Sequence, residues 1–218
     1  MNIYNAGKVC VVSVAFREPY VSHSKRQKEF IEKSNPEVEF MYYRDVLPAN
    51  GNIYTENIVE HFQKSLYGFK PHAIQRAIGE GYKKIIWLDP SVLPTVSITP
   101  LIKALDEHPV IVRTGDAPIS KMTNQKAKDW FGVTEDEIKD VRHVGGTVYC
   151  FNFNSPAAVK VFSLWMSSEK NGIFGDQDSF MAGHWSDEAC MALSLHKCEV
   201  PQYWCEEFGY QNQKELPL

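Results

Sequence analysis

Short apolar runs alternate with longer amphipathic segments along the chain. The β-branched run from Lys8 to Phe16 is nearly continuous, which is typical of a strand covered on both faces. Residues 68–81 carry apolar side chains at helical spacing and end in Gly81, so they predict a helix, with the strand 83–89 directly after it. Further strands are predicted at 37–43, 110–113, 144–153 and 199–204, and further helices at 22–33, 100–107, 121–131, 134–140, 155–169 and 186–197.

This alternation of strands and helices predicts the fold class. Strands joined by helices pair in parallel through right-handed crossovers, so we expect one α/β domain over residues 1–218. Its sheet should be mostly parallel, Rossmann-like, with helices on both faces. Ligands of such sheets bind beyond the carboxyl ends of the strands. That rule points to Phe16, Arg17, Asp89 and the segment after Phe153.

Composition narrows the class of partner. The chain has 218 residues, of which 44% are hydrophobic, and its 27 acidic against 23 basic side chains give a net charge of −4. This is the profile of a soluble globular protein, and it disfavours nucleic acid as a partner, although a local basic groove at Lys121, Lys126 and Lys128 stays open. No apolar run of about 18 residues occurs, so we expect no membrane span.

Cysteine usage bears on the compartment. The five cysteines are odd in number and form no C-x-x-C pair, which favours buried free thiols in a reducing compartment. The first residues lack a small-residue cleavage site after their short apolar run, so we expect no signal peptide. The expected localisation is cytoplasmic.

Asp89 is the first candidate for chemistry. It ends a buried Ile-Ile-Trp-Leu strand, where a carboxylate can ligate Mg²⁺ or Mn²⁺ beside a diphosphate. The alternative is an Asp that begins an Asp-Pro turn through a bond to its own backbone. Lys70, at the start of the preceding helix, could bind phosphate or be solvated. Arg17 could contact a ligand or be exposed.

A resemblance to a known family rests on the stretch from Tyr67 to Val92. It resembles the GT-A fold glycosyltransferases, which use nucleotide sugars and carry a lysine at a helix start before a strand that ends in Asp-x-Asp. The family's lysine falls on Lys70, its first acid on Asp89 and its second acid on Ser91. Residues 144–152 and 184–189 are more weakly similar to the family's glycine-containing acceptor strand and its late His-x-x-Asp-Gln/Glu helix start.

The resemblance implies a hexosyl- or pentosyltransferase that moves a sugar from a nucleotide-diphosphate sugar to an acceptor hydroxyl. The acceptor would be a glycan or glycoconjugate, with a modified base in DNA left open. Mn²⁺ or Mg²⁺ is the implied cofactor, with Asp89 and His184 as ligands, although His184 could instead be a structural hydrogen bonder. Ser91 stands where the family has its second acid. Either the metal therefore binds weakly without the diphosphate, or the enzyme works without a metal through Lys70 and Arg17. The expected donor-binding residues are Phe16, Arg17, Lys70, Asp89 and Ser91.

Acceptor-side residues are expected near the last long helix. Asp187 or Glu188, with Asp187 favoured, would act as base or stabilise the anomeric centre, as the resemblance implies. Both acids also suit the first turn of a helix after Ser186. Residues 176–178 form a competing acidic cluster. The expected acceptor-binding residues are Gly145, Gly146 and Trp185. The alternatives are that the glycines form a bulge in a strand and that the tryptophan packs in the core.

Two other functions compete with a glycosyltransferase. A sugar-phosphate nucleotidyltransferase would share the nucleotide site, but residues 16–20 lack the glycine-rich phosphate loop that such an enzyme needs after its first strand. A non-catalytic nucleotide-sugar-binding module is the second alternative, because Ser91 replaces an acid.

Overall fold

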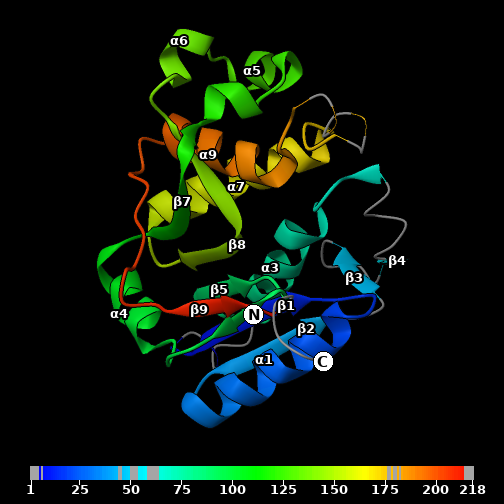
Figure 1. Cartoon of the computed structure of the whole chain (residues 1–218), viewed down its shortest axis with the longest axis vertical. Coiled ribbons are helices and arrows are strands. Elements are labelled where there is room, and N and C mark those ends of the chain that lie inside the picture. The colour runs from blue at the N-terminus through cyan, green and yellow to red at the C-terminus, as the bar shows by residue number, and fades with distance from the viewer. Residues whose placement is uncertain are drawn as a thin grey trace.

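A five-stranded sheet forms the centre of the fold (Figure 1). The structure is a computed structural model that describes residues 5, 7–43, 46–49, 54–57, 64–175, 178, 181 and 183–213. The strand order is β2-β1-β5-β8-β7, in which β1 pairs in parallel with β2 and β5, and β8 is antiparallel to both of its neighbours. The bounds are β1 Val9–Val14, β2 Glu39–Tyr43, β5 Lys84–Leu88, β7 Val110–Pro118 and β8 Arg142–Asn152.

Helices cover both faces of this sheet. One face packs against α3 (Phe69–Gly79), α7 (Pro156–Lys170) and α9 (Ser186–Lys197), and the other against α1 (Tyr20–Ser34) and α4 (Thr99–Glu107) (Figure 1). Strand β1 shows why both faces are covered. Cys10 and Val12 belong to the first core, while Val9 and Val11 belong to the second, because side chains alternate along a strand. The predicted α/β class, mostly parallel sheet and two-sided helical cover are therefore confirmed.

Strand β8 was not expected to run against the others. Its pairing with β5 places Val148 opposite Leu88, and the Asp89 amide donates to the Thr147 carbonyl oxygen at 2.9 Å. The beginning of β8 therefore lies at the same edge of the sheet as the carboxyl ends of β1 and β5. An antiparallel strand thus adds Gly146 and Thr147 to the edge at which ligands of α/β sheets bind.

Other elements differ from the sequence-based expectation. The strand predicted at 199–204 is wrong, since the last strand is β9 (Tyr210–Asn212), which pairs with β6 (Val92–Pro94). The hairpin β3 (Val46–Ala49) and β4 (Tyr54–Asn57) was not predicted. The predicted polar helices are present but shorter, as α5 (Gln125–Phe131) and α6 (Glu135–Ile138), after the 3₁₀ turn Ile119–Met122.

The cysteine thiols lie mostly inside the protein. All five cysteines are free, and four of them are buried. Among the described residues, no helix has the length and apolar character that crossing a membrane requires. The organisation of residues 1–218 as a single domain stays a prediction.

Candidate active site

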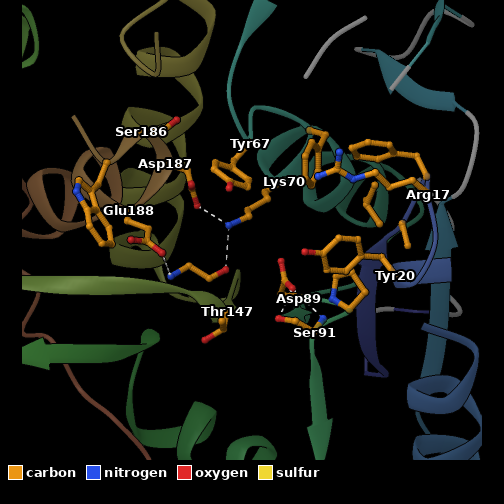
Figure 2. Close-up of a pocket in the computed structure, with 17 residues that line it drawn as sticks. Arg17, Tyr20, Tyr67, Lys70, Asp89, Ser91, Thr147, Ser186, Asp187 and Glu188 are labelled. Carbon is orange, nitrogen blue, oxygen red and sulfur yellow. Dashed lines mark hydrogen bonds and ion pairs between the residues drawn. The ribbon is translucent and has the colours of Figure 1, made fainter. Parts of the chain in front are cut away.

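One cavity of about 290 Å³ opens at the carboxyl edge of β1 and β5 (Figure 2). It is lined by residues that follow these strands, by the starts of α3 and α9, and by the first half of β8. Its walls come from six places in the chain, namely residues 14–17, residue 20, residues 67, 69 and 70, residues 89–91, residues 146–147 and residues 185–188. Every predicted site residue except Gly145 and His184 lines it.

A buried ion pair joins two of these walls. The Lys70 ammonium lies 2.7 Å from Asp187 Oδ2 and 2.9 Å from the Gly146 carbonyl oxygen, and both side chains are almost fully buried. The Tyr149 hydroxyl donates to the same carboxylate oxygen at 3.0 Å. Three aromatic rings surround the ammonium, and that of Tyr67 has its centroid 4.8 Å away. This cluster ties the start of α3 to the start of α9.

Burial and pairing act against each other on the ionisation of this pair. Burial raises the pKa of the Asp187 carboxyl to about 6, against the opposing attraction of Lys70. Burial alone would lower the pKa of Lys70, but the carboxylates of Asp187, Asp89 and Glu188 outweigh it and raise that pKa above its ordinary value. At neutral pH both groups are charged, so Asp187 is held by Lys70 and Tyr149.

Glu188 is the more accessible of the two adjacent acids. Its side chain is 22% exposed, compared with 2% for Asp187. The Gly146 amide donates to Oε1 at 2.6 Å, and His143 Nε2 lies 2.7 Å from Oε2. These two bonds orient a carboxylate that still faces the cavity. The geometry therefore differs from the sequence-based preference for Asp187 as the reacting acid.

Gly146 is crowded by side chains. A Cβ at this position would lie 2.6 Å from Lys70 Nζ, 2.9 Å from Glu188 Oε1 and 3.0 Å from Asp187 Oδ2. The absence of a side chain therefore lets the charged cluster reach the backbone of β8. Gly145 does not line the cavity, and a Cβ there would make ordinary contact with Arg113 at 3.7 Å.

The two glycines give a matched test of this crowding. We expect Gly146→Ala to lower the free energy of unfolding by about 1–3 kcal/mol, because the new methyl group displaces Lys70 from Asp187. Gly145→Ala should change it by less than about 0.5 kcal/mol, since its methyl group would make only ordinary van der Waals contact with Arg113. Chemical denaturation of both variants measures the difference. Equal effects would contradict the crowding at Gly146.

Asp89 and Ser91 form the turn after β5. Asp89 Oδ1 accepts from the Ser91 amide at 2.9 Å and from the Ser91 hydroxyl at 2.6 Å, which is the local turn that sequence reasoning held as the alternative. Among the described residues, Asp89 Oδ2 has no hydrogen-bond donor. Figure 2 shows this carboxylate at the cavity, between Lys70 and Tyr20. Asp89 thus makes the turn and still offers one oxygen to a ligand.

An aromatic and cationic group lies at the β1 end of the cavity. The Arg17 guanidinium carbon is 5.9 Å from the ring centroids of both Phe16 and Tyr20. Phe16 also packs edge-on against Phe69, with ring centroids 5.9 Å apart. A planar guanidinium with flanking rings suits a planar, polar ligand.

His184 and Trp185 lie at the start of α9 with different surroundings. His184 is fully buried, its Nε2 donates to the Ile173 carbonyl oxygen at 2.8 Å, and burial lowers its pKa. It does not line the cavity, so the geometry favours the structural alternative over a metal ligand. Trp185 is 39% exposed and lines the cavity, and its ring meets His143 edge-on at 5.3 Å.

Metal-binding groups are sparse. In the part of the chain that the structure describes, no three His, Cys, Asp or Glu side chains gather as a metal site. Asp176 and Gln177 of the competing acidic cluster lie outside the described residues. Of the basic side chains considered for nucleic acid, Lys128 pairs with Glu135 and Lys126 donates to the Gly172 carbonyl oxygen at 2.9 Å.

Sequence reasoning missed three residues of this site. Tyr67 and Tyr149 face Lys70, and His143 holds Glu188. Tyr67 adopts φ 59°, an uncommon conformation outside glycine, directly before α3. No local motif marks these residues, because each acts across strands or helices that are distant in sequence.

Comparison with known proteins gives a likeness in structure only. No family model and no curated protein sequence matches the chain. Mouse xyloside xylosyltransferase 1 is similar at 12% identity, with a TM-score of 0.49 over 90% of this chain and 83% of that one. A glycosyltransferase involved in glycosylation of the major capsid of PBCV-1 is similar at 15% identity, with a TM-score of 0.45 over 78% and 70% of the two chains. The galactosyltransferase LgtC is similar at 17% identity, with a TM-score of 0.43 over 80% and 69%. All three TM-scores are below 0.5.

Proposed function

We propose that this protein is a glycosyltransferase that moves a sugar from a nucleotide-diphosphate sugar to an acceptor hydroxyl. One observation carries the proposal: a single cavity holds three kinds of chemistry in a row (Figure 2). Arg17 and Tyr20 lie at one end, the Asp89–Ser91 turn in the middle, and Asp187 with Glu188 at the other end. A nucleoside, a diphosphate and a sugar follow one another in the same order.

The donor would lie along the β1 and β5 ends. Phe16, Arg17 and Tyr20 would bind the nucleoside by stacking and by guanidinium hydrogen bonds. Lys70 has three N–H donors, and Asp187 and the Gly146 carbonyl oxygen use two of them. The third is left for an oxygen of the diphosphate or sugar.

The charge of the cavity favours a divalent cation with the donor. Three carboxylates, of Asp89, Asp187 and Glu188, line it against the two cations Arg17 and Lys70. A diphosphate adds further negative charge. Asp89 Oδ2, on a carboxylate whose Oδ1 accepts from the Ser91 hydroxyl, fits a site for Mn²⁺ or Mg²⁺ that substrate phosphates and water complete, because such ions often use only one or two carboxylates. When bound, the cation would offset the charge of the leaving diphosphate.

The acceptor would lie at the α9 end. Glu188 would take the proton of the acceptor hydroxyl as that oxygen bonds to the anomeric carbon. The bond from the anomeric carbon to the diphosphate oxygen breaks, and its electron pair leaves with the nucleoside diphosphate. Trp185 offers an exposed ring for a glycan or glycoconjugate. Asp187 would keep the Lys70 ammonium in place. The sugar transferred would be a hexose or a pentose.

Asp89→Ala tests the donor site. A panel of nucleotide sugars is incubated with the protein, with and without Mn²⁺, and both binding and hydrolysis are measured. We expect the variant to bind its donor roughly 10–100-fold more weakly in Mn²⁺, since a charge-assisted contact is lost. Asp116→Ala removes an exposed carboxylate of β7 outside the cavity and should behave as the wild type.

Each competing function has its own outcome, in this assay or in a parallel one that contains a nucleoside triphosphate and a sugar phosphate. If the wild type binds and hydrolyses no donor and Asp89→Ala changes nothing, the glycosyltransferase proposal is wrong. Donor binding without hydrolysis or transfer to any acceptor indicates the binding module. Release of pyrophosphate from a nucleoside triphosphate and a sugar phosphate indicates the nucleotidyltransferase.

A further inference from the structure

Two buried glutamines hold the turn that carries Asp89. Gln27 comes from α1 and Gln213 directly follows β9, so they lie 186 positions apart in the sequence, and both side chains are fully buried. Gln27 Nε2 donates to the carbonyl oxygens of Asp89 at 3.0 Å and Val92 at 2.7 Å. Gln213 Nε2 donates to the carbonyl oxygen of Pro90 and to that of His23 in α1, both at 3.0 Å.

The main chain of Gln213 completes this arrangement. Its amide donates to the Ser91 carbonyl oxygen at 2.7 Å. Each of the four carbonyl groups from Asp89 to Val92 therefore accepts from one of the two glutamines. Burying an amide is unfavourable unless it is hydrogen-bonded. The hydrogen bonds to the turn therefore offset the cost of burying two amides from different elements beside it.

The orientation of the amides is unambiguous. Turning either amide over would point its Oε1 at carbonyl oxygens. As they stand, neither Oε1 has a partner among the described residues, which costs free energy at two buried positions. The arrangement therefore satisfies the carbonyl groups of the turn at the expense of the glutamine oxygens.

The turn controls where the Asp89 carboxylate points. Asp89 Oδ1 is held by the amide and hydroxyl of Ser91, so the position of Ser91 sets the direction of Oδ2 into the cavity. Neither glutamine lines the cavity. They act on a ligand only through the backbone between Asp89 and Val92.

We propose that Gln27 and Gln213 are positioning residues that hold the Asp89–Ser91 turn in the shape that binds the donor diphosphate. The proposal rests on the proposed function for its ligand, but the holding of the turn does not depend on any ligand. Donor binding would then require contributions from Gln27 of α1 and from Gln213 after β9, two side chains that do not line the cavity.

Methionine substitutions test this with little change in shape. Gln27→Met and Gln213→Met each remove the buried donors from a different element. Gln211→Met is the matched control, because Gln211 is an exposed glutamine of β9. Val133→Ala, in the connection between α5 and α6, serves as a destabilised control away from the turn (Figure 1).

Two readouts separate the turn from the ligand. Amide hydrogen exchange at Ser91 and Val92 in the ligand-free protein should be about 10–100-fold faster in both glutamine variants, unchanged in Gln211→Met, and faster in Val133→Ala by no more than its loss of global stability accounts for. The dissociation constant for UDP, GDP, CDP or ADP in Mn²⁺, whichever the wild type binds, should rise at least about tenfold in the glutamine variants only. The KM for the acceptor should not change.

The outcomes distinguish this inference from the proposed function. Unchanged exchange in both glutamine variants overturns the inference, and so does faster exchange with unchanged nucleotide affinity. If Val133→Ala loses as much nucleotide affinity as the glutamine variants, the loss comes from lower stability alone, and the inference is also overturned. If the wild type binds none of the nucleotides, the proposed function is overturned. The role of the glutamines in holding the turn is then decided by exchange alone.

Discussion

Lys70→Met is expected to lower the free energy of unfolding by about 3–5 kcal/mol, the range measured when one partner of a buried ion pair is removed. The methionine would leave the Asp187 carboxylate buried with the Tyr149 hydroxyl as its remaining side-chain donor. The Gly146 carbonyl oxygen would also lose its shorter hydrogen bond, at 2.9 Å, and keep the one from Trp87 Nε1 at 3.3 Å. Chemical denaturation at neutral pH measures the loss.

The double variant Lys70→Met/Asp187→Leu separates stability from function. Removing both charges avoids a buried unpaired ion, so we expect it to regain most of the stability that Lys70→Met loses. It should still fail to turn over a donor if the third N–H of Lys70 binds the diphosphate or sugar. Lys126→Met, which removes an exposed lysine with one carbonyl partner, should change stability by less than about 0.5 kcal/mol. A loss below about 1 kcal/mol for Lys70→Met would contradict a structural role for the pair.

Patterns that are local in sequence predicted the frame of this fold. The apolar run of β1 and the helix-strand unit of α3 and β5 are each complete within one segment, so their positions and the location of Asp89 at a strand end could be inferred. The direction of β8 could not. Its glycine-containing sequence suits either direction, and pairing along both edges with β5 and β7 decides between them.

The roles of adjacent acids depended on contacts that no local pattern reveals. Asp187 and Glu188 follow one another in α9, and sequence reasoning preferred Asp187. The choice depends on Lys70, more than a hundred positions earlier in the chain, which lies 2.7 Å from Asp187, and on His143, which lies 2.7 Å from Glu188. The paired glutamines of the Asp89 turn went unnoticed for the same reason. The sequence of an amphipathic helix does not show which backbone groups a buried glutamine will bond, because those groups belong to another part of the chain.

Glu188→Gln is expected to lower the kcat of sugar transfer by about 10²–10⁴-fold, the usual contribution of a positioned general base. The amide keeps the size of the carboxyl group and can still accept from the Gly146 amide, so the cavity should keep its shape. It cannot take the proton of an acceptor hydroxyl. The affinity for the donor nucleotide should therefore stay within about threefold of the wild type, since an interaction lost only in the transition state lowers kcat without weakening ground-state binding.

The comparison with Asp187 makes this result specific to Glu188. Asp187→Asn should act mainly on stability, because it weakens the pair with Lys70, whereas Glu188→Gln removes a carboxylate that is 22% exposed to the cavity. Glu206 is an exposed glutamate that follows α9 and does not line the cavity. The control variant Glu206→Gln should therefore leave kcat unchanged. Steady-state kinetics at saturating donor and acceptor, with a denaturation curve for each variant, provide the measurement. If Glu188→Gln keeps more than about a tenth of the wild-type kcat, Glu188 is not the group that accepts the proton, because removing a general base lowers kcat by more than tenfold.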